Sequence, residues 1–191
     1  MIVYGLTGKT GSGKSTAAAM LSEKGFFVID GDKIARRITQ KGSPVLNDLA
    51  DSFGKDIILS DGSLDRGKLA ERAFSTPEKT DMLNRITHGA IDKIFRKEIE
   101  KGEKEGFEKC IIDAAALLES PSKSLCEKMV VIHAPLEIRL ERILERDNIS
   151  LSQAMTRINA QKCDEYYLGK ADIIIRNYPP YELSKELEKV D

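Results

Sequence analysis

Residues 5–16 read GLTGKTGSGKST and lie between an apolar run at 2–7 and an alanine-rich run at 16–21. Glycine costs backbone entropy wherever it occurs, so this concentration of glycine indicates that the backbone must approach another group closely. Residues 8–15 fit the pattern G-x-x-x-x-G-K-[ST] of a phosphate loop, and a strand before it and a helix after it are the context this pattern requires. The stretch therefore predicts a nucleotide-binding α/β fold rather than a glycine turn that only joins strand to helix.

The chemistry of such a loop assigns roles to its residues. Backbone N–H groups turn inward around a polyphosphate, at the positive end of the following helix. Lys14 would reach the β- and γ-phosphates, and Ser15 would hold Mg²⁺. The residues expected to bind the nucleotide in this stretch are Gly8, Gly11, Ser12, Gly13, Lys14, Ser15 and Thr16.

Apolar runs elsewhere in the chain predict the rest of the sheet. They lack polar alternation, as expected for strands covered on both faces, and helical patterns separate them. We therefore predict an α/β fold with a parallel five-stranded sheet flanked by helices. The expected strands are IVYGLT (2–7), FFVI (26–29), CIID (110–113), MVVIHA (129–134) and ADIIIR (171–176).

The segment between the second and third runs is too long for one crossover and contains several helical patterns. We interpret residues 33–107 as a helical region inserted at the edge of the sheet. The whole chain, 1–191, is then a single domain whose core comprises 1–32, 108–135 and 171–191.

Composition limits the possible partners and compartments. The chain is 41% hydrophobic and 32% charged, and no apolar run approaches the roughly 20 residues that cross a bilayer. Its net charge of −1 provides no overall field for nucleic acid, so we expect neither a nucleic-acid nor a membrane partner. Three widely spaced cysteines and no signal-peptide pattern favour the cytoplasm. We expect a monomer or a weak homo-oligomer.

A phosphate loop alone does not distinguish kinases, GTPase switches and ATPases. The guanine-reading N-K-x-D motif is absent, and the only D-x-x-G match, at 51–54, ends a helical pattern, so we exclude a switch. A small-molecule kinase needs a carboxylate near the acceptor hydroxyl. Asp30-Gly31-Asp32 directly follows a predicted strand, where open α/β sheets bind ligands, although Asp and Gly also suit a turn or a helix cap.

The stretch LEIRLERILERD at 136–147 indicates cations for a transferring phosphoryl group. On a helix, Arg139, Arg142 and Arg146 fall within about 60° of one another, and the glutamates gather opposite. Like charges four residues apart destabilise a helix by a few tenths of a kcal/mol, which a surface helix would avoid. Arg157 and Gln161 also lie four residues apart and could close over the nucleotide or simply solvate a helix.

Three further residues are weaker candidates. Asp113 ends a predicted strand and could coordinate Mg²⁺ through water, or could be an ordinary residue at the end of a strand. His133 also ends a strand and is interpreted as structural. His88 lies among the inserted helices and could pack there or contact an acceptor.

Taken in order, these motifs resemble the dephospho-coenzyme A kinase family, in the nucleoside monophosphate kinase branch of phosphate-loop proteins. The resemblance covers almost the whole chain. It rests on GLTGKTGSGKST, VIDGDKIAR, DGSLDRGKLAERAF, LNRITH, PLEIRLERILERD, RINAQ and KADIIIRN. This chain departs from the family's pattern at His88-Gly89, at Ala115-Ala116, and at Arg139, where the family often has glutamine.

The resemblance implies transfer of the γ-phosphoryl group of ATP to the ribose 3′-hydroxyl of dephospho-coenzyme A, the last step of coenzyme A biosynthesis. It implies a core, a helical acceptor-binding region and a lid, here 136–165. By position, Asp32 would be the catalytic base, and Lys14, Arg142 and Arg146 would act on the phosphoryl group. Nucleotide binding would extend to Arg142, Arg157 and Gln161, acceptor binding to Asp32, Arg36, Arg66 and His88, and Mg²⁺ binding to Ser15 and Asp113.

Two alternatives remain open at the level of sequence. Shikimate kinases also have Asp-x-Asp after the second strand, but their Gly-Gly-Arg-Gly motif has no counterpart, because the chain contains no Gly-Gly pair. A module that binds ATP without transferring phosphate would not require three arginines gathered on one helix face.

Overall fold

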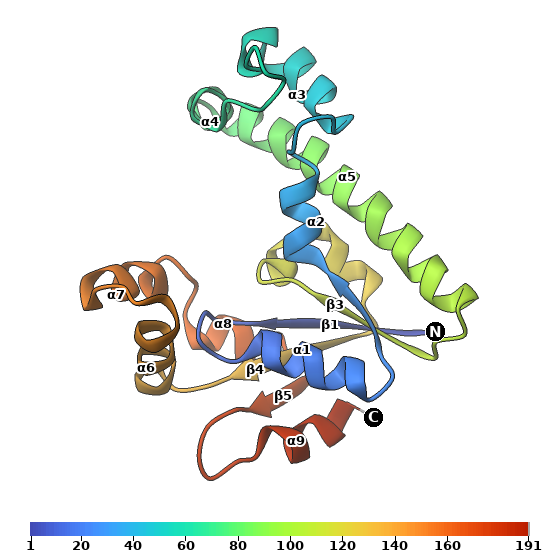
Figure 1. Cartoon of the computed structure of the whole chain (residues 1–191), viewed down its shortest axis with the longest axis vertical. Coiled ribbons are helices and arrows are strands. Elements are labelled where there is room, and N and C mark those ends of the chain that lie inside the picture. Colours follow the sequence, from blue (N-terminus) through green and yellow to red (C-terminus); the bar gives the residue numbers. More distant parts are fainter. Residues whose placement is uncertain (191) are drawn as a thin grey trace. The chain divides into compact units, whose positions relative to one another are not determined.

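The predicted sheet is confirmed. The computed structural model describes residues 1–190; Asp191, which ends the expected core range, lies outside them. Five strands form a single sheet in the order β2-β3-β1-β4-β5 (Figure 1), and the printed registers between β1 and β3, β1 and β4, and β4 and β5 are parallel. The strands are β1 (Ile2–Gly8), β2 (Phe27–Asp30), β3 (Lys109–Asp113), β4 (Lys128–His133) and β5 (Ile173–Arg176).

The central strand β1 brings the phosphate loop next to two neighbouring strand ends. Its register places Leu6 opposite Asp113 on β3 and Gly8 opposite Ile132 on β4. Because β1 is buried from Val3 onward, its apolar side chains fix the register. The chain therefore leaves the sheet at Gly8 beside the carboxyl ends of β3 and β4.

Helices cover the sheet and build one core. Alanines of α1 (Lys14–Glu23) and apolar residues near the C-terminus pack with β1, β3, β4 and β5. The small alanine side chains on α1 let the helix lie close to the strands. The buried residues of this core are Tyr4, Leu6, Ala17, Ala18, Leu21, Phe26, Ile111, Val130, Ile132, Ile175, Leu187 and Val190.

Two helices after β4 pair with each other. Helix α6 (Leu136–Asp147) and helix α7 (Leu151–Asn159) lie side by side (Figure 1) around Ile143, Ala154 and Ile158. Ser150 and Gln153 form a capping box that fixes the start of α7. Along the chain, the short helix α8 (Asp164–Leu168) precedes β5 and the short helix α9 (Leu183–Glu186) follows it.

The chain divides into two compact units, one of residues 1–29 and 99–191 and one of residues 30–98. The second contains α2 (Gly31–Arg37), α3 (Val45–Phe53), α4 (Arg66–Ala73) and most of α5 (Pro77–Lys104), which Figure 1 shows as one unbroken helix. Its α3–α4 part buries Val45, Leu46, Leu49, Ala50, Phe53, Ile57, Leu69 and Ala73. The sequence predicts helices throughout this region, and the structure contains them.

Two further features bear on the predicted environment. No helix in residues 1–190 has both the length and the apolar composition needed to cross a membrane. The three cysteines are free thiols, with Cys110 buried and Cys163 exposed.

Candidate functional site

The phosphate loop connects β1 to α1 through two glycines in the left-handed conformation. Gly11 has φ 79° and Gly13 has φ 93°, and α1 begins at Lys14 with no side chain capping its N-terminus. The first turn of α1 contains no acidic residue. The first N–H groups of a helix have no partners within it, and they carry a partial positive charge. The loop and the start of α1 therefore form a site suited to a polyphosphate.

The lysine of the loop is held by the strand next to β1. Lys14 Nζ forms an ion pair and a hydrogen bond with Asp113 Oδ1, at the carboxyl end of β3. Both side chains are largely buried, so the ammonium group is oriented before any ligand arrives. Asp113 is thus adjacent to the phosphate loop, as the expected metal role requires, while Ser15 begins the first turn of α1.

Gly11 makes the tightest approach between the loop and α6. A Cβ atom built on Gly11 would lie 2.5 Å from the carbonyl oxygen of Arg139, which is backbone and cannot rotate away. We expect Gly11→Ala to weaken ADP binding at least tenfold and to lower Tm, because it adds this clash to a left-handed conformation that costs about 1–2 kcal/mol per residue.

Gly25→Ala is the matched control for that prediction. Gly25 has φ 89°, but a Cβ there has no atom within 4 Å. It should lower Tm through backbone strain alone and leave ADP binding unchanged, as measured by calorimetry. Equal losses of ADP affinity in the two variants would contradict a specific role for the close approach at Gly11.

Arg142 and Asn177 bind the backbone carbonyl oxygens of the phosphate loop. Arg142 Nη1 donates to the carbonyl oxygens of Gly11 (3.3 Å) and Ser12 (3.4 Å), and its Nη2 donates to the carbonyl oxygen of Asn177 (2.9 Å). Asn177 Nδ2 donates to the Ser12 carbonyl oxygen at 2.8 Å. Arg142 therefore lies at the loop, and its role toward the nucleotide stays a prediction. Asn177 was not among the predicted residues, although its position directly after β5 is where ligand-binding residues of open sheets occur.

The other residues expected to belong to a lid occupy two different environments. Gln161 Oε1 accepts a hydrogen bond from the Thr10 backbone N–H at 2.9 Å, which places Gln161 at the phosphate loop. Arg146 and Arg157 instead share the carboxylate of Asp147, at 2.8 Å and 2.6 Å. Both arginine side chains are more than half exposed.

The three arginines of α6 do not form one exposed stripe. Arg139 is 2% exposed, and its Nε donates to the Ala134 carbonyl oxygen at 3.0 Å. Helical spacing aligned it correctly with Arg142 and Arg146, but residues outside α6 bury it. The arrangement thus provides one arginine at the loop, one exposed arginine and one buried arginine.

Asp30 and Asp32 have different surroundings in the 30–98 unit. Asp30 caps α2, because its Oδ1 accepts a hydrogen bond from the Lys33 backbone N–H at 2.7 Å. Asp32 lies in the first turn of α2, and its carbonyl oxygen accepts a hydrogen bond from Arg36 Nε at 3.2 Å. The helix-cap interpretation therefore applies to Asp30 and leaves Asp32 as the candidate for chemistry.

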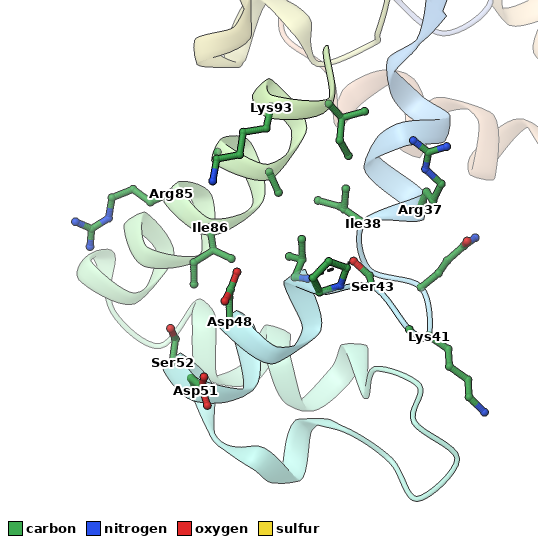
Figure 2. A pocket seen from close by; sticks show the side chains of 17 residues that line it. Arg37, Ile38, Lys41, Ser43, Asp48, Asp51, Ser52, Arg85, Ile86 and Lys93 are labelled. Atoms are coloured by element: carbon green, nitrogen blue, oxygen red, sulfur yellow. Dashed lines mark hydrogen bonds between the residues drawn. The ribbon is translucent and has the colours of Figure 1, made fainter. Parts of the chain in front are cut away.

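The same unit contains a pocket of about 860 Å³. Figure 2 shows Asp48, Ser43, Ile38 and Ile86 around it, whereas Lys41 and Arg85 extend away from it. The lining comes from the end of α2, the 40–44 loop, α3 and α5, and it combines an apolar floor with charged groups; the cations are Arg37, Lys41, Arg85 and Lys93, and the acids are Asp48 and Asp51.

The expected acceptor residues lie in this unit too. Arg66 Nη2 donates to Thr39 Oγ1 at 2.8 Å, and His88 lies on α5 next to Gly89, which lines the pocket. The pocket itself was not predicted, because it is formed by side chains far apart in the sequence.

His133 ends β4 beside a group of charges. Burial lowers its pKa below the usual 6.5; the charge of Asp164 acts in the opposite direction, and those of Arg139, Lys9 and Arg176 lower the pKa further. In the unfolded chain His133 takes up a proton at higher pH than in the folded chain. The free energy of unfolding should therefore be unaffected by His133 above about pH 6.5 and should fall as the pH drops below that value.

Replacing His133 with asparagine tests this. Urea unfolding between about pH 7 and pH 5 should show a shallower loss of stability in His133→Asn than in the unmodified chain. An identical slope in both proteins would mean that His133 does not contribute.

Comparison with known proteins agrees with this geometry. The parallel sheet with its phosphate loop between β1 and α1 is the fold of phosphate-loop kinases, and the chain has this fold. The model of the dephospho-CoA kinase family matches residues 1–180. The chain belongs to the dephospho-CoA kinase family and is a kinase.

Individual relatives support the assignment. A dephospho-CoA kinase of Carboxydothermus hydrogenoformans is 38% identical over 96% of this chain and 89% of the relative, and one of Corynebacterium diphtheriae is 40% identical over 93% and 88%. Among solved structures, TT1252 from Thermus thermophilus has a TM-score of 0.80 at 28% identity, covering 99% of this chain and 95% of the other. A shikimate kinase from Acinetobacter baumannii, at 13% identity and a TM-score of 0.53, covers 100% and 90% and shares the fold alone.

Proposed function

We propose that this chain transfers the γ-phosphoryl group of ATP to the ribose 3′-hydroxyl of dephospho-CoA, the last step of CoA biosynthesis. The observation that carries the proposal is the phosphate loop at the start of α1, in a chain that belongs to the dephospho-CoA kinase family. The loop is the evidence for nucleotide binding, and membership of the family is the evidence for dephospho-CoA as the acceptor.

In this proposal the positive charges of Lys14 and Arg142 stabilise the negative charge on the phosphoryl group during transfer. Phosphoryl transfer is catalysed mainly by positioning and by cations over the developing charge. Lys14 is oriented by Asp113, and Arg142 contacts the loop carbonyl oxygens of Gly11 and Ser12. A guanidinium group already at the loop needs only a small movement to contact a phosphate oxygen there.

The residues near the loop fit Mg²⁺ bound together with the nucleotide. No group of three or more His, Cys, Asp or Glu side chains that could hold a metal exists within residues 1–190. Mg²⁺ normally retains several waters and uses one or two protein oxygens plus substrate phosphates. Ser15 would provide a direct oxygen ligand, Asp113 would hold the ion through a bound water, and the ion would neutralise charge on the phosphates.

Asp32 is proposed as the base that accepts the proton of the acceptor hydroxyl. The argument for Asp32 is chemical: Asp30, the last residue of β2, caps α2, and Asp32, in the first turn of α2, is the other carboxylate at this strand end. Ligands of open α/β sheets bind where the strands end. The proton would move from the 3′-hydroxyl to the Asp32 carboxylate as the oxygen attacks phosphorus.

The pocket of the 30–98 unit is proposed as part of the acceptor site. Its apolar lining suits the pantetheine arm, and the two lining cations other than Lys41 and Arg85, namely Arg37 and Lys93, suit the pyrophosphate of dephospho-CoA. Arg36, Arg66 and His88 are proposed to contact the acceptor. Residues 33–107 would then be the acceptor-binding region.

Residues 136–165 are proposed as the lid over the nucleotide. Gln161 contacts the loop at Thr10, and Arg146 and Arg157 would exchange Asp147 for phosphate when nucleotide is bound. A cytoplasmic location and a monomeric or weakly oligomeric state stay predictions.

An acceptor panel tests the proposal. ADP release would be measured with ATP and Mg²⁺ in the presence of dephospho-CoA, shikimate, AMP, CMP or no acceptor. We expect turnover with dephospho-CoA only. Turnover with another acceptor would assign a different substrate, and no turnover in protein that binds ATP would indicate a binding module.

A further inference from the structure

Lys9 of the phosphate loop belongs to a cluster of charged side chains together with Asp164 and Arg139. Lys9, the second residue of the loop, forms an ion pair between its Nζ and Asp164 Oδ1 at 2.8 Å, and its side chain is only 12% exposed. Arg139 Nη2 lies 3.7 Å from the same carboxylate oxygen. Burial raises the pKa of Asp164, but the ion pair with Lys9 and the charges of Arg139 and His133 outweigh it and lower the pKa overall. Asp164 is therefore ionised and holds two cations.

This cluster joins the loop to the segment that follows β4. Arg139 belongs to α6 and Asp164 begins α8, so one carboxylate connects both helices with Lys9. Gly11 lies against the Arg139 backbone, and Thr10 is bound by Gln161. Residues 9–11 of the loop each contact the segment 136–168.

The cluster also contains buried polar atoms without hydrogen-bond partners. Lys9 and Arg139 share the carboxylate of Asp164, and Glu137 is a second negative charge that acts on Arg139. Arg139 Nη1, Ser12 Oγ and Asp164 Oδ1 are buried and have no hydrogen-bond partner within residues 1–190, so Asp164 holds Lys9 and Arg139 by charge. Arg139 and Ser12 line a cavity of about 10 Å³, the size of one water molecule.

We propose that Asp164 is a positioning residue that fixes the phosphate loop in its binding conformation by anchoring Lys9 to Arg139. It touches no substrate in this account and acts only through Lys9 and Arg139. The inference depends on one part of the proposed function, namely that the loop binds a nucleotide. It does not depend on which acceptor is phosphorylated. Because these ion pairs order the loop before the nucleotide arrives, binding does not have to meet the free-energy cost of ordering it. Removing the ion pairs should therefore weaken nucleotide binding.

Asp164→Asn separates positioning from plain electrostatics. The substitution removes a negative charge near the phosphates, so an electrostatic effect alone would tighten ADP binding. Loss of the anchor predicts the opposite: a Kd for ADP and Mg²⁺ raised roughly tenfold, which corresponds to about 1.4 kcal/mol of binding free energy. Asp164→Glu, which retains the charge, should recover most of the affinity.

A double-mutant cycle tests whether Lys9 and Asp164 act together. Lys9→Met should weaken ADP binding about as much as Asp164→Asn, and the double variant should bind no more weakly than either single variant. Independent sites would instead give multiplied fold-changes. Glu182→Gln is the control, because Glu182 pairs with Lys185 at 2.9 Å on the exposed surface, and it should change nothing.

All binding measurements would use ADP without an acceptor, well below the Tm of each variant. Tighter or unchanged ADP binding in Asp164→Asn, or multiplied effects in the double variant, would overturn the proposal. Failure of the acceptor assignment would leave these binding results unchanged, so the two failures are distinguishable.

Discussion

Replacing Asp32 with asparagine is expected to lower kcat by about 10³-fold, within the range that a positioned general base contributes. ATP binding should persist, because the phosphate loop and α1 belong to a different part of the chain from Asp32. Asparagine has nearly the same size but cannot take up the hydroxyl proton. The measurement is steady-state turnover together with calorimetric ATP binding.

Asp30→Ala is the matched control, since it alters the neighbouring carboxylate. Asp30 caps α2 through the Lys33 N–H, and loss of a cap costs about 1 kcal/mol. We expect a lower Tm and a kcat within a few-fold of normal at a temperature where the variant is folded. Normal turnover in Asp32→Asn would refute the role of Asp32 as base.

Replacing Lys14 with methionine is expected to lower kcat/KM by about 10³-fold, because a preorganised cation over the transferring phosphoryl group is lost. The effect should include weaker nucleotide binding, since Lys14 would contact the phosphates in the ground state as well. Asp113 would also lose the ion pair that holds it at the loop.

Lys14→Arg distinguishes charge from geometry at this position. Arginine keeps the positive charge, but its planar guanidinium group is larger and differs in shape from an ammonium group. Both side chains in the Lys14–Asp113 pair are largely buried, so we expect Lys14→Arg to be almost as impaired as Lys14→Met. Circular dichroism would verify folding, and near-normal turnover in either variant would contradict the assignment.

The elements that sequence predicted well are encoded locally. The loop at 8–15 needs glycine where φ is positive, and the residues show it directly. The strands are short apolar runs, and the parallel order follows from helices between them. The helix-cap alternative for Asp30 was visible in the sequence, but only the hydrogen bond to Lys33 assigned it.

What the sequence could not provide depends on distant contacts. Helical spacing aligned Arg139 with Arg142, but only packing shows that Arg139 is buried and Arg142 contacts the loop. The pairing of Lys9 with Asp164 joins residues 155 positions apart, which no spacing rule reports. The pocket in the 30–98 unit likewise requires α2, α3 and α5 to be brought together.

The central claim is tested most directly by following the phosphorus atom. ATP labelled in its γ-phosphoryl group would be incubated with Mg²⁺, dephospho-CoA and the full chain, and the products would be separated and analysed by mass spectrometry and ³¹P NMR. The account predicts that the label appears as a monoester on the ribose 3′-oxygen, in equal amount to the ADP released. Label recovered as inorganic phosphate, or on another oxygen of the acceptor, would contradict it.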